Sequence, residues 1–189
     1  LRRVTPGQIN QQAAETTAMS PNAIRRSDVL DDLSGAIHES RRHLPLALSV
    51  GRLNPVKGMD RVVTAWASDP RLHETCNLVI VGGDLCDPSA TERAVLAQID
   101  QAVPVDDPRR AGLVLLGGRP HLDVARLQIA ATAGRDGAWS DGGIYVDGAL
   151  KEEFGLALLE SLAAGLVVVA PSTGGPSTYV DHGDIGELA

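Results

Sequence analysis

The sequence predicts an α/β fold built on a doubly wound parallel sheet. From residue 46 onward, short apolar runs alternate with stretches of helical pattern. The runs are apolar throughout instead of alternating between apolar and polar residues, which is typical of strands covered on both faces. An alternation of such strands with helices favours parallel pairing, with helices on both sides of the sheet.

Five apolar runs are predicted to be strands, because each is short and is followed by a loop residue. They span residues 46–50 (LALSV), 78–81 (LVIV), 113–116 (LVLL), 143–146 (GIYV) and 167–170 (VVVA). Ligands of doubly wound sheets bind beyond the carboxyl ends of the strands. The loops expected to carry a site therefore begin at Gly51, Gly82, Gly117, Asp147 and Pro171.

Between these strands the pattern predicts helices. They cover residues 60–67, 89–103, 122–133, 155–164 and 176–182. Ser89 followed by Glu92 forms a capping-box pattern at the start of the second helix. Residues 1–44 are polar, charged and weakly periodic, with helical potential over 9–18 and 27–42. We therefore expect a partly helical connector or arm over 1–44, followed by one domain over 45–189.

The composition limits the function. Of 189 residues, 43% are hydrophobic and only 3% aromatic, and the net charge is −7. An acidic chain poor in aromatics is not expected to bind nucleic acid or an anionic membrane in general. Cys76 and Cys86 form neither a disulfide framework nor a zinc motif. No apolar run could span a bilayer, and the start of the chain does not resemble a signal peptide, so we expect a cytoplasmic protein.

The loop after the first predicted strand carries two cations. Arg52 and Lys57 lie five residues apart in the segment GRLNPVKG, which begins at Gly51. A guanidinium offers a planar fork to phosphate oxygens and an ammonium offers a compact charge, so together they could neutralise a diphosphate. The same spacing is also compatible with two solvated surface cations.

A second candidate site lies around Gly155, in the segment EEFGLALLE that runs from Glu152 to Glu160. Gly155 permits close approach of the backbone to a ligand, and the free N–H groups at the start of the following helix favour an anion. Glu160 is a carboxylate in an otherwise apolar helix and needs a partner or ligand hydroxyls. Alternatively, Glu152 and its neighbour only complement the helix dipole.

The third candidate loop follows the last predicted strand and reads STGGP. Gly174, Gly175 and Pro176 are typical of a tight turn that enters a helix. Turn statistics favour ordinary turn chemistry for this segment. None of the three loops is specific when taken alone.

The three loops in this order resemble retaining glycosyltransferase family 4, which includes sucrose synthase and sucrose-phosphate synthase. The resemblance rests on Arg-x4-Lys, Glu-x-Phe-Gly-Leu-x3-Glu and Gly-Gly-Pro, and it covers the chain from about residue 46 to the end. Residues 123–131 (DVARLQIAA) and 165–170 (GLVVVA) are similar to further segments of that family. The resemblance implies a Rossmann-like domain, the C-terminal half of a two-domain GT-B enzyme. Because the chain lacks an initial Met and a closing helix, we expect a fragment of a longer polypeptide.

The resemblance also implies roles for individual residues in holding a nucleoside-diphosphate sugar, with UDP-glucose favoured. Arg52 and Lys57 would bind the diphosphate and stabilise it as leaving group, and Glu152 would contact the donor sugar. Glu160 would accept hydrogen bonds from ribose. The remaining donor-binding residues implied by the resemblance are Gly51, Gly82, Gly118, Arg119, Leu122, Phe154, Gly155 and Leu156.

The family transfers the sugar to an acceptor hydroxyl with retention of anomeric configuration, and its acceptor site lies mainly in the N-terminal domain. No Asp-x-Asp pair occurs here, so a reaction without metal or other cofactor is expected. The isolated chain is expected to be inactive in transfer. Residues 135–142, an insertion relative to the family, could reshape the donor cleft or form a mobile loop.

Of three other functions, one does not fit the sequence and two remain open. A dinucleotide-dependent oxidoreductase would require Gly-x-Gly-x-x-Gly after the first strand, and the segment Gly51–Asn54 does not fit that pattern. A non-catalytic nucleotide-sugar-binding or interaction domain would share the fold. A phosphorylase or epimerase of the same two-domain architecture would share both the fold and the motifs.

Overall fold

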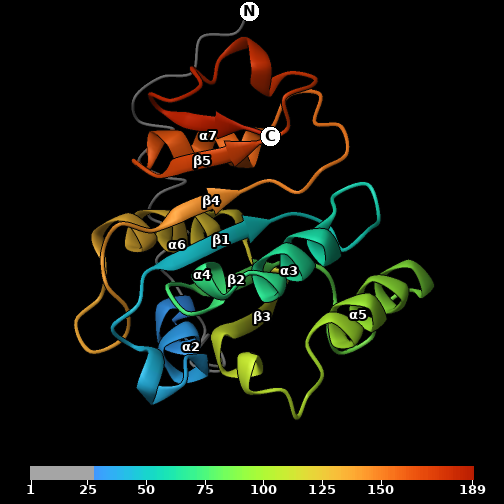
Figure 1. The fold of residues 1–189 in the computed structure, drawn as a ribbon, viewed down its shortest axis with the longest axis vertical. Helices are drawn as coiled ribbons and strands as arrows, with labels where there is room; N and C mark the ends of the chain where they lie inside the picture. The colour runs from blue at the N-terminus through green and yellow to red at the C-terminus, as the bar shows by residue number, and fades with distance from the viewer. Residues whose placement is uncertain (1–27) are drawn as a thin grey trace, which may run out of the picture.

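The computed structural model describes residues 28–189, and all five predicted strands are present in it (Figure 1). They are β1 (Leu46–Val50), β2 (Asn77–Val81), β3 (Leu113–Gly117), β4 (Ile144–Val146) and β5 (Val167–Ala170). A sixth strand, β6 (Gly186–Leu188), was not predicted. All pairs are parallel, in the order β3-β2-β1-β4-β5-β6. The predicted doubly wound sheet is therefore confirmed.

Four helices lie close to their predicted ranges, and the short helix at Pro70–His73 was not predicted. The α-helices are α2 (Val29–Ala36), α3 (Met59–Ser68), α4 (Pro70–His73), α5 (Ala90–Ala102), α6 (His121–Ala133) and α7 (Leu156–Ala163). Three 3-10 helices join them, η1 (Glu39–Arg41), η2 (Pro108–Gly112) and η3 (Pro176–Thr178). The capping box of Ser89 and Glu92 at the start of α5 is confirmed.

Two helix predictions need correction. Residues 176–182 form only the three-residue η3, because the backbone leaves helical values at Tyr179, with φ of −141° and ψ of −7°, and the chain then continues to the edge strand β6. The range 27–42 divides into α2 and η1, because Ile37 and His38 are extended. The predicted helix over 9–18 lies outside the described residues.

Apolar side chains cover both faces of the sheet. Leu46, Leu48, Val79, Val81 and Val168 belong to a cluster with the buried residues of α2, α6 and α7. Ala47, Leu78, Ile80 and Leu113 belong to a second cluster with α3 and α5. Neighbours along one strand thus alternate between two apolar cores, which explains why the strands read as continuous apolar runs.

Helix α2 belongs to the first of these cores. Val29, Leu33 and Ile37 are at most 2% exposed, and α2 packs against α6 and β3. Two ion pairs reinforce this contact, one between Arg119 and Asp32 and one between Arg126 and Asp28. The boundary at residue 44 stays a prediction, but the described part of the predicted arm is integrated into the fold.

The carboxyl ends of β1 and β2 approach each other through glycines. Gly51 donates its N–H to Val81 at 3.0 Å, and Gly82 donates to Gly117 at 2.9 Å. Gly82 has φ of 148°, and a Cβ there would collide with the carbonyl oxygen of Gly51. Only glycine fits this close approach, which brings the loops of three neighbouring strands to one rim.

Candidate functional site

The sheet order reverses between β1 and β4, and a cavity of about 380 Å³ opens at that point. In doubly wound sheets the crevice beyond such a switch point is the usual ligand site. The end of β1, the end of β4 and the start of α7 surround the cavity. Its lining residues are Val50, Gly51, Arg52, Lys57, Met59, Tyr145, Asp147, Glu152, Phe154, Gly155, Leu156, Ala157 and Leu158.

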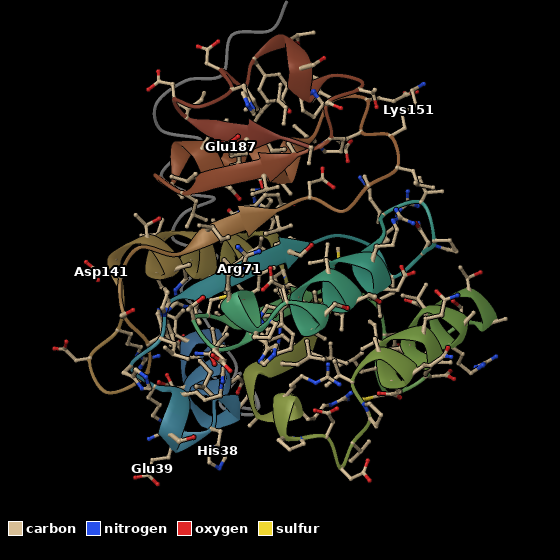
Figure 2. The ribbon with its side chains drawn as sticks, in the orientation of Figure 1. His38, Glu39, Arg71, Asp141, Lys151 and Glu187 are labelled. Carbon is tan, nitrogen blue, oxygen red and sulfur yellow. The ribbon has the colours of Figure 1, made fainter. Side chains whose placement is uncertain are left out.

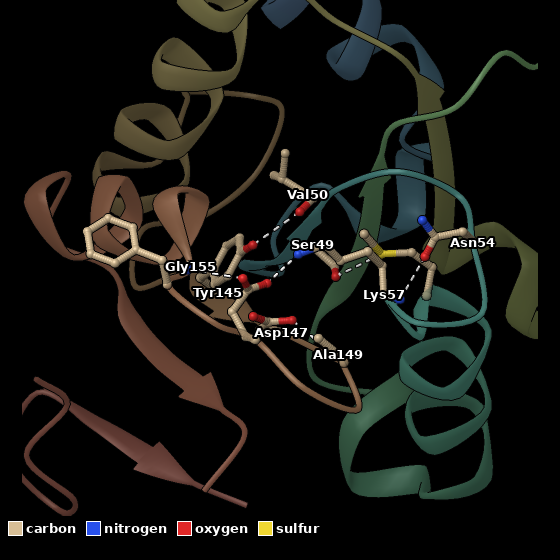
Figure 3. A network of polar contacts seen from close by, with 12 residues as sticks. Ser49, Val50, Asn54, Lys57, Tyr145, Asp147, Ala149 and Gly155 are labelled. Carbon is tan, nitrogen blue, oxygen red and sulfur yellow. Dashed lines mark hydrogen bonds and ion pairs between the residues drawn. The ribbon is translucent and has the colours of Figure 1, made fainter. Parts of the chain in front are cut away.

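The loop after β1 is fixed by its own hydrogen bonds. Lys57 donates its backbone N–H to the side chain of Asn54 at 3.0 Å and to the carbonyl of the same residue at 3.1 Å. Gly58 then adopts a left-handed conformation, with φ of 62°, and α3 begins at Met59. These contacts hold the stem of Lys57 beside the cavity, and Figure 3 shows them. Arg52 lines the same cavity and is exposed.

The loop before α7 brings Glu152 to the opposite wall. Gly155 is left-handed, with φ of 77°, and its N–H donates to Oε1 of Glu152 at 3.1 Å. The other carboxylate oxygen of Glu152 forms an ion pair with Nζ of Lys57. Burial raises the pKa of Glu152, but the hydrogen bond and charge of Lys57 outweigh this effect, so the pKa is lowered overall. The two loops are therefore joined across the cavity.

The Gly-Gly-Pro segment contacts the backbone of the Glu152 loop on the side away from the cavity. Gly175 donates its N–H to the carbonyl of Glu152 at 2.9 Å, and Glu152 and Gly174 form a parallel bridge. A Cβ at Gly174 would collide with that carbonyl oxygen. Tyr179 donates its hydroxyl to the carbonyl of Phe154 at 2.5 Å. These glycines hold the backbone of the Glu152 loop and lie outside the cavity lining.

Three further groups line the cavity, and of these the sequence indicated only Asp147, as the start of a loop. Tyr145 is buried, and its hydroxyl donates to the carbonyl of Val50 at 3.2 Å. Met59 lies against Ser49, whose Oγ is 3.1 Å from the methionine sulfur. Asp147 accepts the N–H of Ala149 at 2.9 Å, and its burial raises its pKa. The sequence does not show that the loop at Asp147 faces Lys57, because this follows from the pairing of β1 with β4 in the sheet.

Replacing Asp147 with asparagine is expected to stabilise the ligand-free protein at pH 7–8. The raised pKa means that the unfolded chain ionises at lower pH than the folded protein, so stability from this group is lost as pH rises through the folded pKa. Asparagine can still accept the N–H of Ala149 without that cost. Thermal unfolding should show a melting temperature higher by the order of 1–3 °C, with the gain shrinking as pH falls towards the usual aspartate range. The exposed Asp141→Asn serves as control, and an equal gain in both variants would contradict the burial argument.

The remaining predicted residues lie outside the cavity. Glu160 is on α7 and contacts His121 at the start of α6, with 2.7 Å between Oε1 and Nε2. Arg119 donates to the carbonyl of Leu116 and pairs with Asp32, and Leu122 is exposed. Gly118 borders a neighbouring hollow of about 540 Å³ together with Gly83 and Leu85. Gly82 shapes the rim through its contact with Gly51.

The insertion at residues 135–142 lies at the opposite end of the sheet. It joins α6 to the amino end of β4, and Figure 2 shows Asp141 on one side of the molecule and Lys151, which directly precedes the cavity residue Glu152, on the other. Trp139 is buried and donates its indole N–H to the carbonyl of Ala130 at 2.9 Å. The insertion therefore does not reshape the cavity, and its tryptophan packs into the core.

Comparison with known proteins gives a consistent family match. Residues 45–189 match the family model described as Glycosyl transferases group 1. Sucrose synthase of Nitrosomonas europaea is 30% identical over 140 residues, which is 73% of this chain and 17% of that protein. Sucrose synthase of Solanum tuberosum is 28% identical over 148 residues, 77% of this chain and 17% of that protein. The chain therefore spans about one sixth of the length of these sucrose synthases.

Solved structures share the fold. Anabaena HepE in complex with UDP-glucose superimposes with a TM-score of 0.62 at 23% identity, over 90% of this chain and 39% of that one. Sucrose-phosphate synthase from Thermosynechococcus elongatus gives a TM-score of 0.60 at 23% identity, over 86% of this chain and 35% of that one. Among the described residues, no helix combines the length and the apolar character that crossing a bilayer requires.

Proposed function

Because this chain belongs to the group 1 glycosyl transferases, we propose that it binds a nucleoside-diphosphate sugar, UDP-glucose in the first place, for retaining transfer to an acceptor hydroxyl. The family resemblance noted in the sequence, and the Rossmann-like C-terminal half of a GT-B enzyme that it implies, are confirmed by the family match and by the fold. The proposal adds the identity of the donor, the retention of anomeric configuration and the roles of individual residues.

One observation carries the proposal. A single cavity brings together Arg52, Lys57, Glu152 and the amino end of α7 at Gly155. Two cations and a helix amino terminus suit a diphosphate, since all three stabilise negative charge. Carboxylates beside them accept hydrogen bonds from sugar hydroxyls. The arrangement therefore fits a ligand with a phosphate end and a sugar end.

The same groups suit the proposed chemistry. Breaking the bond between sugar and phosphate places negative charge on the departing diphosphate, which fixed cations and helix N–H groups stabilise. Arg52 and Lys57 would carry this charge without a metal. UDP-glucose is favoured because the family resemblance implies this donor, and because UDP-glucose is bound in the HepE structure, which shares the fold. The acceptor stays open.

A calorimetric screen tests the donor proposal directly. UDP, GDP and ADP, and their glucose derivatives, are titrated into the 189-residue chain. We expect UDP and UDP-glucose to bind tightest. Absence of binding for all of them would contradict the proposal, and a preference for GDP or ADP would change the donor. Sugar transfer by this chain alone is not expected, because it spans 17% of the sucrose synthases it matches.

Replacing Glu160 with glutamine is expected to weaken UDP binding by roughly 1.5–3 kcal/mol while leaving inorganic diphosphate almost unaffected. The proposal gives Glu160 the ribose hydroxyls, which inorganic diphosphate lacks. In this structure Nε2 of His121 lies 2.7 Å from Oε1 of Glu160, which is one to two turns along α7 from Gly155. Calorimetry with both ligands makes the comparison. Equal losses for the two ligands would exclude a ribose contact.

A further inference from the structure

In this structure a carboxylate of the chain itself occupies the anion-binding groups of the cavity. Oε1 of Glu152 accepts the N–H of Gly155 at 3.1 Å, and Oε2 pairs with Nζ of Lys57. These are the ammonium and the helix terminus that the proposed function assigns to a diphosphate. A carboxylate and a phosphate oxygen need the same donors, so the two groups cannot hold these donors fully at the same time.

The ion pair between Glu152 and Lys57 lies where a bound phosphate would compete with the Glu152 carboxylate. The side chain of Glu152 is 13% exposed and that of Lys57 is 28% exposed, so solvent screens their attraction only in part. The lowered pKa of Glu152, set by Lys57 against the effect of burial, shows that the surroundings favour an anion at this position. The carboxylate therefore contacts the same donors that a phosphate oxygen would use.

Only the side chain of Glu152 needs to move when a ligand enters. The carbonyl of Glu152 is held by the N–H of Gly175 at 2.9 Å, and the backbone of the loop bridges to Gly174. Tyr179 holds the next part of the loop through the carbonyl of Phe154. The anchored backbone keeps a displaced carboxylate within the cavity. Its negative charge then lies close to the phosphate that displaced it. The two charges repel each other, and only a hydrogen-bond donor to the carboxylate would offset that repulsion.

We propose that Glu152 is a specificity-determining residue, whose carboxylate competes with phosphate for Lys57 and the start of α7 and thereby favours the sugar nucleotide over the free nucleoside diphosphate. This inference rests on the proposed function. A nucleoside diphosphate displaces the carboxylate and leaves its charge without a partner, which is costly in a partly buried site. A sugar nucleotide displaces it too, but offers hydroxyl donors to the freed oxygens. Discrimination arises because one ligand leaves a charge unpaired and the other does not.

The test compares Glu152→Gln with wild type by calorimetry, using inorganic diphosphate, UDP, UDP-glucose and uridine. Glutamine keeps the size of the side chain and removes its charge. We expect diphosphate and UDP to bind roughly 3- to 30-fold tighter and uridine to be unchanged. UDP-glucose should gain less than UDP, because it loses a hydrogen bond to a carboxylate. The preference for UDP-glucose over UDP should therefore fall.

Glu153→Gln is the matched control, since it removes the same charge one residue away. Glu153 is exposed, pairs with the exposed Lys151 and does not line the cavity. All four ligands should keep their affinities within about twofold in this variant. A similar gain for UDP in both variants would reduce the effect to net charge and overturn the inference.

The outcomes separate the inference from the proposed function. If wild type binds UDP and Glu152→Gln binds it no better, the competition is excluded while the donor site stands. If wild type binds neither UDP nor diphosphate, the proposed function fails and the inference with it. Should Glu152→Gln unfold, a structure of the wild-type chain with bound UDP decides. An opened pair between Lys57 and Glu152 supports competition, and an intact pair beside bound diphosphate overturns it.

Discussion

Replacing Lys57 with alanine is expected to weaken UDP binding by about 1–3 kcal/mol, and replacing Arg52 with alanine by a similar amount. Both residues line the cavity beside the amino end of α7, where each would form charge-assisted hydrogen bonds to the diphosphate. The expected loss corresponds to roughly 5- to 150-fold in the dissociation constant. Calorimetry with UDP measures it.

Lys151→Ala provides the control for these two variants. Lys151 is 67% exposed, lies in the same loop as Glu152 and pairs with Glu153 outside the cavity. Its removal changes the net charge by the same amount and should leave UDP affinity unchanged, as expected for an exposed ion pair. If Lys57→Ala and Arg52→Ala both retained wild-type affinity, neither residue would bind the phosphates.

Replacing Gly82 with alanine is expected to lower the free energy of unfolding by about 2–5 kcal/mol. A Cβ at this position would penetrate the carbonyl oxygen of Gly51, and backbone atoms cannot rotate away as a flexible side chain can. The positive φ of 148° adds strain for any residue with a side chain. Relief of the clash would require the ends of β1 and β2 to separate. Denaturation with urea measures the loss.

Gly137→Ala separates the collision from the backbone strain. Gly137 also has a positive φ, of 70°, but a Cβ there would meet no atom within 4 Å. Its substitution should cost only the left-handed conformation, about 1–2 kcal/mol. A loss at Gly82 no larger than the loss at Gly137 would show that the strand ends can move apart without penalty.

Local sequence patterns were sufficient for most of the fold. The runs at 46–50, 78–81, 113–116 and 167–170 are strands of a sheet with an apolar core on each face, so all of their positions except Ser49 are apolar. Strand β6 was not predicted because Gly186–Leu188 contains no apolar run. It is defined by its pairing with β5, which is a tertiary contact. Helix α4 has a single turn and begins at a proline, a pattern that also suits a turn.

The candidate site also has a part that the local sequence predicted and a part that it did not. The loops at Arg52 and Gly155 were predicted to share a rim, and the switch between β1 and β4 brings them to one cavity. The partners of charged side chains could not be predicted, because they lie far apart along the chain. Glu160 meets His121 across 39 positions, and Arg119 meets Asp32 across 87. The assignment of Glu160 and Arg119 to the nucleotide remains a prediction.

The burial of α2 in the core bears on where this domain can be cut. The family match begins at residue 45, yet Val29, Leu33 and Ile37 fill part of the core beneath α6 and β3. A recombinant chain started at residue 45 would leave that apolar surface bare to water, and such surfaces promote aggregation. The span of the family model therefore leaves out a helix that belongs to the packed core, and expression trials of this domain should begin upstream of Asp28.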